Sequence, residues 1–123
     1  MTYHFTINGR LPNLNDFIRQ NNKNRYAGAE LKARSQKIAE IAIWECMRGI
    51  KINKPVSIVY RWYEKNKRRD LDNVSSFGRK VIQDALVSTG VLVDDGWDYI
   101  RSFSDEFYID SRNPRIEVTI MEV

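Results

Sequence analysis

The chain has 123 residues, of which 42% are hydrophobic and 29% are charged, and its formal net charge is +4. These values are typical of one folded domain with its own core, and they exclude a disordered chain. One cysteine and one histidine are too few for an internal disulfide or for a zinc site with about four nitrogen or sulfur ligands. No segment reaches the roughly 18 apolar residues that a membrane helix needs, and the N-terminus does not look like a signal peptide, so we expect a cytoplasmic protein without a membrane partner.

The N-terminal part of the chain predicts a strand, a long loop and a helix. Residues 2–9 are rich in β-branched and aromatic side chains, which favour a strand that ends at a glycine. Residues 10–28 are polar and rich in asparagine, which predicts a loop whose side chains either contact phosphates or form turns. Residues 29–48 carry apolar side chains at steps of three and four, which predict a helix, and Cys46 is expected in its buried face.

The second half predicts one strong helix among strands. Residues 55–64 alternate between apolar and other side chains and predict a strand. Residues 73–87 carry one apolar face and predict an amphipathic helix, with Asp72 or Asn73 as its N-cap. Three further strands are expected at residues 90–95, 97–110 and 114–123. This order predicts a single α+β domain over residues 1–123, with a mixed or mostly antiparallel sheet and two main helices packed on one face.

The segment KNKRRDLDNVSSFGRK, residues 65–80, places two aspartates directly beside the densest positive charge of the chain. Asp70 and Asp72 are two residues apart, so in an extended chain their carboxylates would point to the same side and could share a divalent ion. Mg²⁺ prefers a few carboxylate oxygens and keeps several waters, which leaves room for a phosphate. A helix N-cap next to a solvated aspartate explains the same pair without a ligand.

A second acidic pair, Asp94 and Asp95, ends the apolar run GVLV. Adjacent strand residues face opposite sides, so only one of the two can readily join the first pair. A turn before Gly96 is the alternative, because aspartate is a favoured turn residue. Three carboxylates set among cations suit metal-assisted hydrolysis of a phosphodiester.

The motif RRDLDN, followed by a helix that contains QDAL and then by VDD, resembles the RusA-type Holliday-junction resolvase family. The resemblance covers nearly the whole chain, and DDGWDYI is similar to a branch found in phage and prophage members. It implies a homodimeric endonuclease, dependent on Mg²⁺ or Mn²⁺, that cuts four-way DNA junctions by paired symmetric nicks in recombination and repair. It also implies that three aspartates hold the metal, namely Asp70, Asp72 and Asp95.

The family also has a functional lysine in the helix after the two aspartates, and this chain departs from the pattern there. At the direct spacing, residues 75–77 are Ser-Ser-Phe. If the helix is one turn longer, Lys80 takes the place of the lysine, about 12 Å along the helix axis from Asp72. Lys80 could then reach a bound phosphate, or it could simply pair with Asp84 on the surface.

A four-way junction is symmetric, and this symmetry suits a homodimer, because an isologous dimer presents two equivalent sites to the junction. Two alternatives stay open from the sequence: a non-catalytic nucleic-acid-binding protein, and a metal-dependent nuclease acting on another branched or single-stranded DNA. The residues expected to bind DNA phosphates are Lys67, Arg68, Arg69, Arg19 and Arg25.

Overall fold

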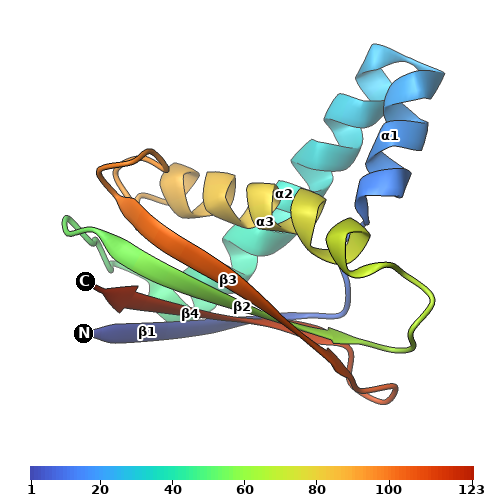
Figure 1. Cartoon of the computed structure of the whole chain (residues 1–123). Helices are drawn as coiled ribbons and strands as arrows, with labels where there is room; N and C mark the ends of the chain where they lie inside the picture. Colours follow the sequence, from blue (N-terminus) through green and yellow to red (C-terminus); the bar gives the residue numbers. More distant parts are fainter.

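The computed structural model describes residues 1–123 and contains a four-stranded sheet with three helices (Figure 1). The elements in chain order are β1 (Thr2–Asn8), α1 (Leu14–Lys23), α2 (Arg25–Met47), β2 (Val56–Glu64), α3 (Leu71–Ser88), β3 (Ile100–Ile109) and β4 (Arg115–Glu122). The strand order is β1-β4-β2-β3, where β2 and β3 are parallel and the other pairs are antiparallel. The helices lie on one face of the sheet, so the predicted α+β class is confirmed, with a mixed sheet.

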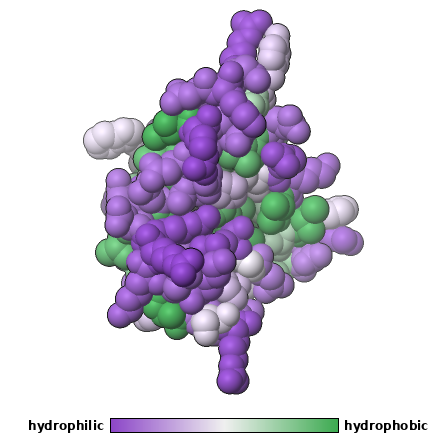
Figure 2. All heavy atoms as spheres, turned by 90° about the vertical axis from the view of Figure 1, so that its right-hand side faces the viewer, coloured by the Kyte–Doolittle hydropathy of each residue, from purple (hydrophilic) through white to green (hydrophobic).

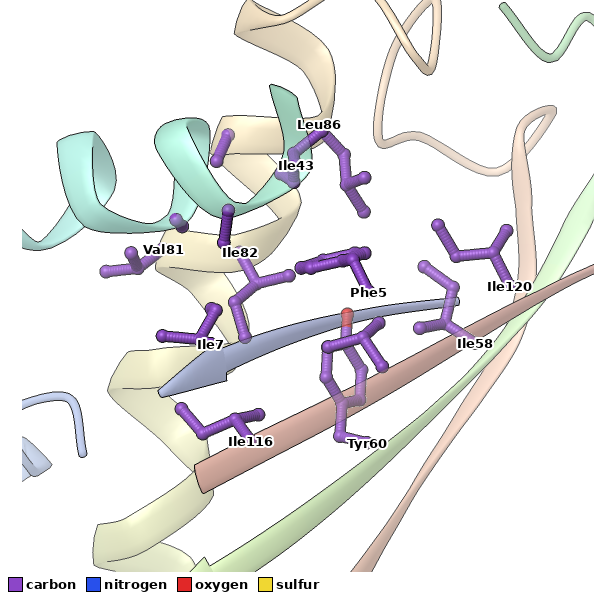
Figure 3. Close-up of a cluster of buried hydrophobic side chains, with 14 of the residues drawn as sticks. Phe5, Ile7, Ile43, Ile58, Tyr60, Val81, Ile82, Leu86, Ile116 and Ile120 are labelled. Atoms are coloured by element: carbon purple, nitrogen blue, oxygen red, sulfur yellow. The ribbon is translucent and has the colours of Figure 1, made fainter. Parts of the chain in front are cut away.

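The core lies between that face of the sheet and helices α2 and α3. Strand β2 alternates as predicted: Val56, Ile58, Tyr60 and Trp62 are buried. Figure 3 shows side chains of β1, β2 and β4 meeting those of α2 and α3 in one apolar cluster. Such a cluster holds the sheet and the two helices together by removing apolar surface from water.

Helix α3 is fixed to the sheet by a close backbone approach and a polar anchor. A Cβ added at Gly78 would lie 2.9 Å from the Trp62 ring, so only glycine allows this contact. The Trp62 indole N–H donates to the Asp105 carboxylate on β3 at 2.9 Å, and Arg79 of α3 forms an ion pair with the same carboxylate. These contacts hold the first half of α3 firmly over β2 and β3.

The segment expected to be a loop contains helix α1 instead, and its asparagines are helix caps. The Asn13 side chain accepts from the backbone N–H of Asp16, while the Asp16 carboxylate accepts from the backbone N–H of Asn13. This reciprocal pair is a capping box. Asn24 ends α1 and begins α2, because its side chain accepts from the backbone N–H of Ala27. As a result α1 and the first part of α2 form a helical hairpin that projects from the sheet (Figure 1).

Helix α2 begins earlier than predicted, at Arg25, and buries a different face. Cys46 is exposed, so its expected core position is wrong. Ile38 and Ile41 keep 48% and 51% of their surface exposed, respectively. The helix turns a row of mostly small residues inward, and small side chains let it lie close to its neighbours. The buried residues are Gly28, Ser35, Ala39, Ala42, Ile43 and Met47.

Two other boundaries differ from the expectation. The strand expected at 90–95 is reduced to a single bridge between Ile52 and Leu92. Helix α3 begins at Leu71, so its N-cap is Asp70 rather than Asp72 or Asn73. None of the three helices has the length and hydrophobicity required to cross a membrane.

Candidate metal and DNA site

The two aspartates of the basic segment lie at the N-terminus of α3. Asp70 is the N-cap with an extended backbone, and its side chain makes no capping hydrogen bond. Asp72 lies in the first turn. Both residues are exposed, and neither takes part in an ion pair. The pair is thus organised by a helix terminus, and not by an extended chain as the sequence suggested.

The loop that leads into α3 carries cations that are also unpaired. Lys67 and Arg68 are exposed and form no ion pair. The backbone N–H of Arg68 donates to the Asn66 side chain at 3.0 Å, which shapes the loop. The free N–H groups and the dipole of a helix N-terminus attract anions, so these cations and the helix reinforce one another.

Arg69, the third expected DNA contact in this loop, is engaged inside the protein. Its guanidinium donates to the Leu11 carbonyl at 3.2 Å, and it lies 3.4 Å from Asp16 and 3.7 Å from Glu64. Burial, followed by the nearby positive charge of Arg10, lowers the pKa of Arg69. Arg69 therefore ties the start of α1 to the end of β2, close to the two aspartates.

The two expected DNA contacts on the hairpin are spread along it. Arg19 on α1 forms an ion pair with Asp16 and keeps 68% of its side chain exposed. Arg25, at the tip of the hairpin, is stacked over the ring of Tyr26 at 5.0 Å. Arg19 and Arg69 share Asp16 as an ion-pair partner, so of the five predicted cations only Arg25, at the start of α2, lies away from the loop before α3. Lys67 and Arg68 are the two beside the aspartates in the chain that form no ion pair.

Asp95 lies over the middle of α3 and contacts Lys80. The Lys80 ammonium is 3.3 Å from Asp95 and 3.1 Å from Asp84, and Asp84 is also 2.8 Å from Lys32 of α2. The hydrogen bond to Asp84 raises the pKa of Lys80. Partial burial alone would raise the pKa of Asp84, but the hydrogen bonds from Lys32 and Lys80 outweigh it and lower that pKa.

The structure does not bring the three aspartates together. Nowhere in the chain do three histidine, cysteine, aspartate or glutamate side chains lie close enough to hold a metal ion. The helical rise between residues 72 and 80 is about 12 Å, and Asp95 is on the Lys80 side of that gap. Asp70 and Asp72 still fit Mg²⁺ in donor chemistry, because the ion needs only one or two carboxylates when water and phosphate oxygens complete its shell.

A cleft of about 400 Å³ opens beside Asp70, and no pattern in the sequence indicates it. It lies between the loop before α3, the first turn of α3 and the C-terminal end of β3. Figure 2 faces this end of the molecule, where the surface is largely hydrophilic with some hydrophobic patches. Parallel pairing of β2 and β3 places Ile109 opposite Glu64, and this long-range pairing is what brings β3 to the site.

The fold and this site define a small α+β protein with free carboxylates and free cations at one helix terminus. A family model described as Endodeoxyribonuclease RusA matches residues 11–121. The chain belongs to this family, and it is a DNA-binding endodeoxyribonuclease of the Holliday-junction resolvase class, which acts on branched DNA in recombination. A comparison with curated proteins found no match.

Proposed function

We propose that the protein resolves four-way DNA junctions by paired symmetric nicks that depend on Mg²⁺, or alternatively Mn²⁺, in recombination and repair in the cytoplasm. Residues 1–123 would form one endonuclease domain. The observation that carries the proposal is that Asp70 and Asp72 are exposed and unpaired at a helix N-terminus, directly beside the unpaired cations Lys67 and Arg68. Oppositely charged groups that do not neutralise each other are available for a ligand that carries both a metal ion and phosphates.

Each group has a separate role in this proposal. Lys67 and Arg68 bind the DNA backbone, and the N-terminus of α3 favours a phosphate nearby. Asp70 and Asp72 hold the ion through their carboxylate oxygens. When bound, the ion supplies a nucleophile by lowering the pKa of a coordinated water.

Asp95 and Lys80 complete the proposed catalytic set. Asp95 lies on the Lys80 side of a gap of about 12 Å, so the ion pair has to separate and Asp95 has to move toward Asp72 before it can serve as the third ligand. Lys80, which keeps 58% of its side chain exposed, would then be free to bind a phosphate oxygen. A cation at that position stabilises the negative charge that develops on the phosphate during cleavage.

The paired nicks require two sites, whereas one chain carries a single pair of acids at a helix N-terminus. We propose a homodimer with a two-fold axis, because such a dimer presents two equivalent sites to the two equivalent strands of a junction. Sedimentation of the protein with and without a junction measures this directly, and the expected species is a dimer in both cases.

The test of the proposed function is cleavage of a synthetic four-way junction beside a linear duplex and a single strand of the same sequence. We expect symmetric nicks in the junction with Mg²⁺ and none with EDTA. Binding without cleavage at any Mg²⁺ or Mn²⁺ concentration would show a non-catalytic binding protein. Equal cleavage of the linear or single-stranded DNA would show a nuclease for another substrate.

A further inference from the structure

The tip of the hairpin between α1 and α2, residues 21–26, lies outside the core. All six tip residues are exposed, and no residue of α1 is buried. Only the base of the hairpin is anchored to the rest of the protein. There the Phe17 ring stacks on Phe77 of α3 at 4.9 Å, and Asp16 lies 3.4 Å from Arg69. Core packing therefore does not explain why the hairpin extends so far beyond its base.

The tip nevertheless has a well-defined shape. Asn24 joins the two helices, because its backbone N–H donates to the Gln20 carbonyl and its side chain accepts from the backbone N–H of Ala27. A Cβ added at Gly28 would lie 3.0 Å from the Asn21 Cα, so the backbones of the two helices are in close contact there. A capped and closely packed turn of this kind holds the tip at a constant position relative to the base.

The tip carries positive charge that the protein does not neutralise. Lys23 and Arg25 are exposed and form no ion pair, and residues 17–29 include no aspartate or glutamate. The side-chain amides of Asn21 and Asn22 are exposed beside them. Cationic groups together with amide N–H donors are the side chains that contact the phosphate and sugar oxygens of DNA.

The tip lies beyond the proposed metal site but on the same side of the molecule (Figure 1). Figure 2 faces that side, and its upper part, where the hairpin projects, is mostly hydrophilic. Asp16 at the base contacts Arg69, the neighbour of Asp70 in the chain. Lys23 is seven residues further along α1, or about 10 Å at 1.5 Å per residue. Phosphates of one duplex strand are about 3.4 Å apart along the axis, so the tip is about three base pairs from its base.

Duplex DNA is the ligand that these observations favour for the tip. A second copy of this chain has a net charge of +4, so it offers no general attraction to the cations of the tip. DNA held at Asp70 continues as a duplex arm, whose regularly spaced negative charges extend over the distance that separates the tip from the site.

We propose that the hairpin tip is a second DNA-binding site, which holds the backbone of one duplex arm of the junction about three or more base pairs from the cleaved phosphate. The inference rests on the proposed function and adds a contact outside the proposed catalytic set. Lys23 and Arg25 bind phosphates there, so the contact does not depend on the base sequence. Because the tip is held in place by its caps, the contact also sets the direction in which the arm leaves the site.

The experiment compares wild type with the double variant Lys23→Ala/Arg25→Ala. The matched control is Lys51→Ala/Lys54→Ala, which also removes two exposed, unpaired cations, but from the segment before β2, at the opposite end of that strand from the loop that leads into α3. Junction affinity is measured in EDTA over a range of salt concentrations. Single-turnover cleavage is measured with Mg²⁺ at saturating protein, and sedimentation gives the oligomeric state.

A second set of junctions locates the contact on the DNA. These junctions carry uncharged methylphosphonate linkages in one arm, either about three to six nucleotides from the nick or at the far end of the same arm. Uncharged linkages near the nick should weaken binding by wild type and leave binding by Lys23→Ala/Arg25→Ala unchanged. Uncharged linkages at the far end should change neither.

Lys23→Ala/Arg25→Ala should bind the unmodified junction at least about tenfold more weakly, with a slope of log affinity against log salt that is smaller by about two. Its cleavage rate at saturation should stay within about twofold of wild type, because the tip contributes binding and does not touch the reacting phosphate. The control should change affinity by less than about threefold, since charges far from the DNA are screened by salt.

Unchanged affinity in Lys23→Ala/Arg25→Ala overturns the inference, and so do equal losses in the two double variants, because general charge then explains them. Uncharged linkages that weaken both proteins equally also overturn it. Loss of the dimer in Lys23→Ala/Arg25→Ala does so too, because the tip would then contact the second subunit. Absence of cleavage by wild type, with the expected affinity changes present, overturns the proposed function and leaves the DNA contact at the tip in place.

Discussion

The first and the third turn of α3 carry the same kinds of charged groups, but the charges are unpaired at the first turn and form ion pairs at the third. Asp70 and Asp72 lie beside Lys67 and Arg68, yet these charges form no ion pairs. About two turns later, Lys80 is shared between two carboxylates, each within 3.3 Å. Both groups are on the surface of the same helix.

The difference shows which charges the fold itself uses. Around Lys80 the charges satisfy one another, and they also link α3 to α2 through Lys32 and Asp84. At the N-terminus of α3, Arg69 makes ion pairs and a hydrogen bond within the protein, whereas its neighbours Lys67 and Arg68 form no ion pair. Changes at the first turn should therefore affect the reaction, and changes at Asp84 should affect only stability.

The largest effect is expected for Asp72→Asn. Removing a carboxylate from the proposed metal site should lower the rate of junction cleavage at least about a hundredfold, because metal stabilisation of the transition state is worth several kcal/mol. Stability should change by less than about 1 kcal/mol, the usual size of a helix-dipole interaction. The control is Asp98→Asn, an exposed aspartate without an ion pair. Similar cleavage rates for the two variants would contradict the assignment.

Arg69→Ala should lower the free energy of unfolding by about 2 kcal/mol, since it leaves Glu64, only 8% exposed, with Arg10 as its remaining partner. Arg68→Ala should change stability by less than about 0.5 kcal/mol. Instead it should weaken junction binding and reduce the slope of log affinity against log salt by about one. Urea unfolding and a salt titration of binding measure the two effects, and the reverse pattern would show that Arg69 is the DNA contact.

Lys80→Ala is expected to lower the cleavage rate about tenfold, because it removes the cation that is proposed to bind a phosphate oxygen during cleavage. Lys32→Ala removes the other partner of Asp84, so it is a matched control that should cleave like wild type. Single-turnover cleavage of a junction measures both variants. Equal losses in the two would mean that Lys80 acts only by holding α3 against α2.

Asp84→Asn should have the smallest effect, a loss of less than about 1 kcal/mol of stability near pH 7. Because the pKa of Asp84 is lower in the folded protein than its usual 3.8, this contribution is present above that pH and disappears as the pH falls further. Unfolding curves of wild type and variant should therefore converge below about pH 3.8. A gap that persists at lower pH would show that packing, and not charge, explains the loss.

Local sequence patterns predicted β1, β2, β4 and most of α3, because each of these elements faces a single apolar core. Alternation in β2 correctly identified Val56, Ile58, Tyr60 and Trp62 as its buried side. The patterns did not predict the structure where polar side chains hydrogen-bond to backbone N–H groups. Asn13 and Asn24 fall in the segment predicted to be a loop, but they cap α1 and α2, and α1 has no fully buried residue to indicate a helix.

The candidate site was predicted only in part for a related reason. The acids and the adjacent cations are consecutive in the chain, so the sequence identified them together. The internal role of Arg69 depends on Asp16 and Leu11, and the cleft depends on parallel pairing of β3 with β2. These partners are far apart in the sequence, and no local pattern indicates that they meet. Asp95 is separated from the first two aspartates because it lies beside Lys80, about 12 Å along the helix axis from Asp72.

The most direct test of the account is the location of the bound ion in the DNA-free protein. Mn²⁺ broadens the amide NMR signals of nuclei near it, so a titration shows where it binds without any need for cleavage. We predict that signals around Asp70 and Asp72 broaden first, and that Asp70→Asn weakens this effect strongly. Broadening that begins elsewhere, or that is the same in Asp70→Asn, would contradict the assignment of the metal site to the N-terminus of α3.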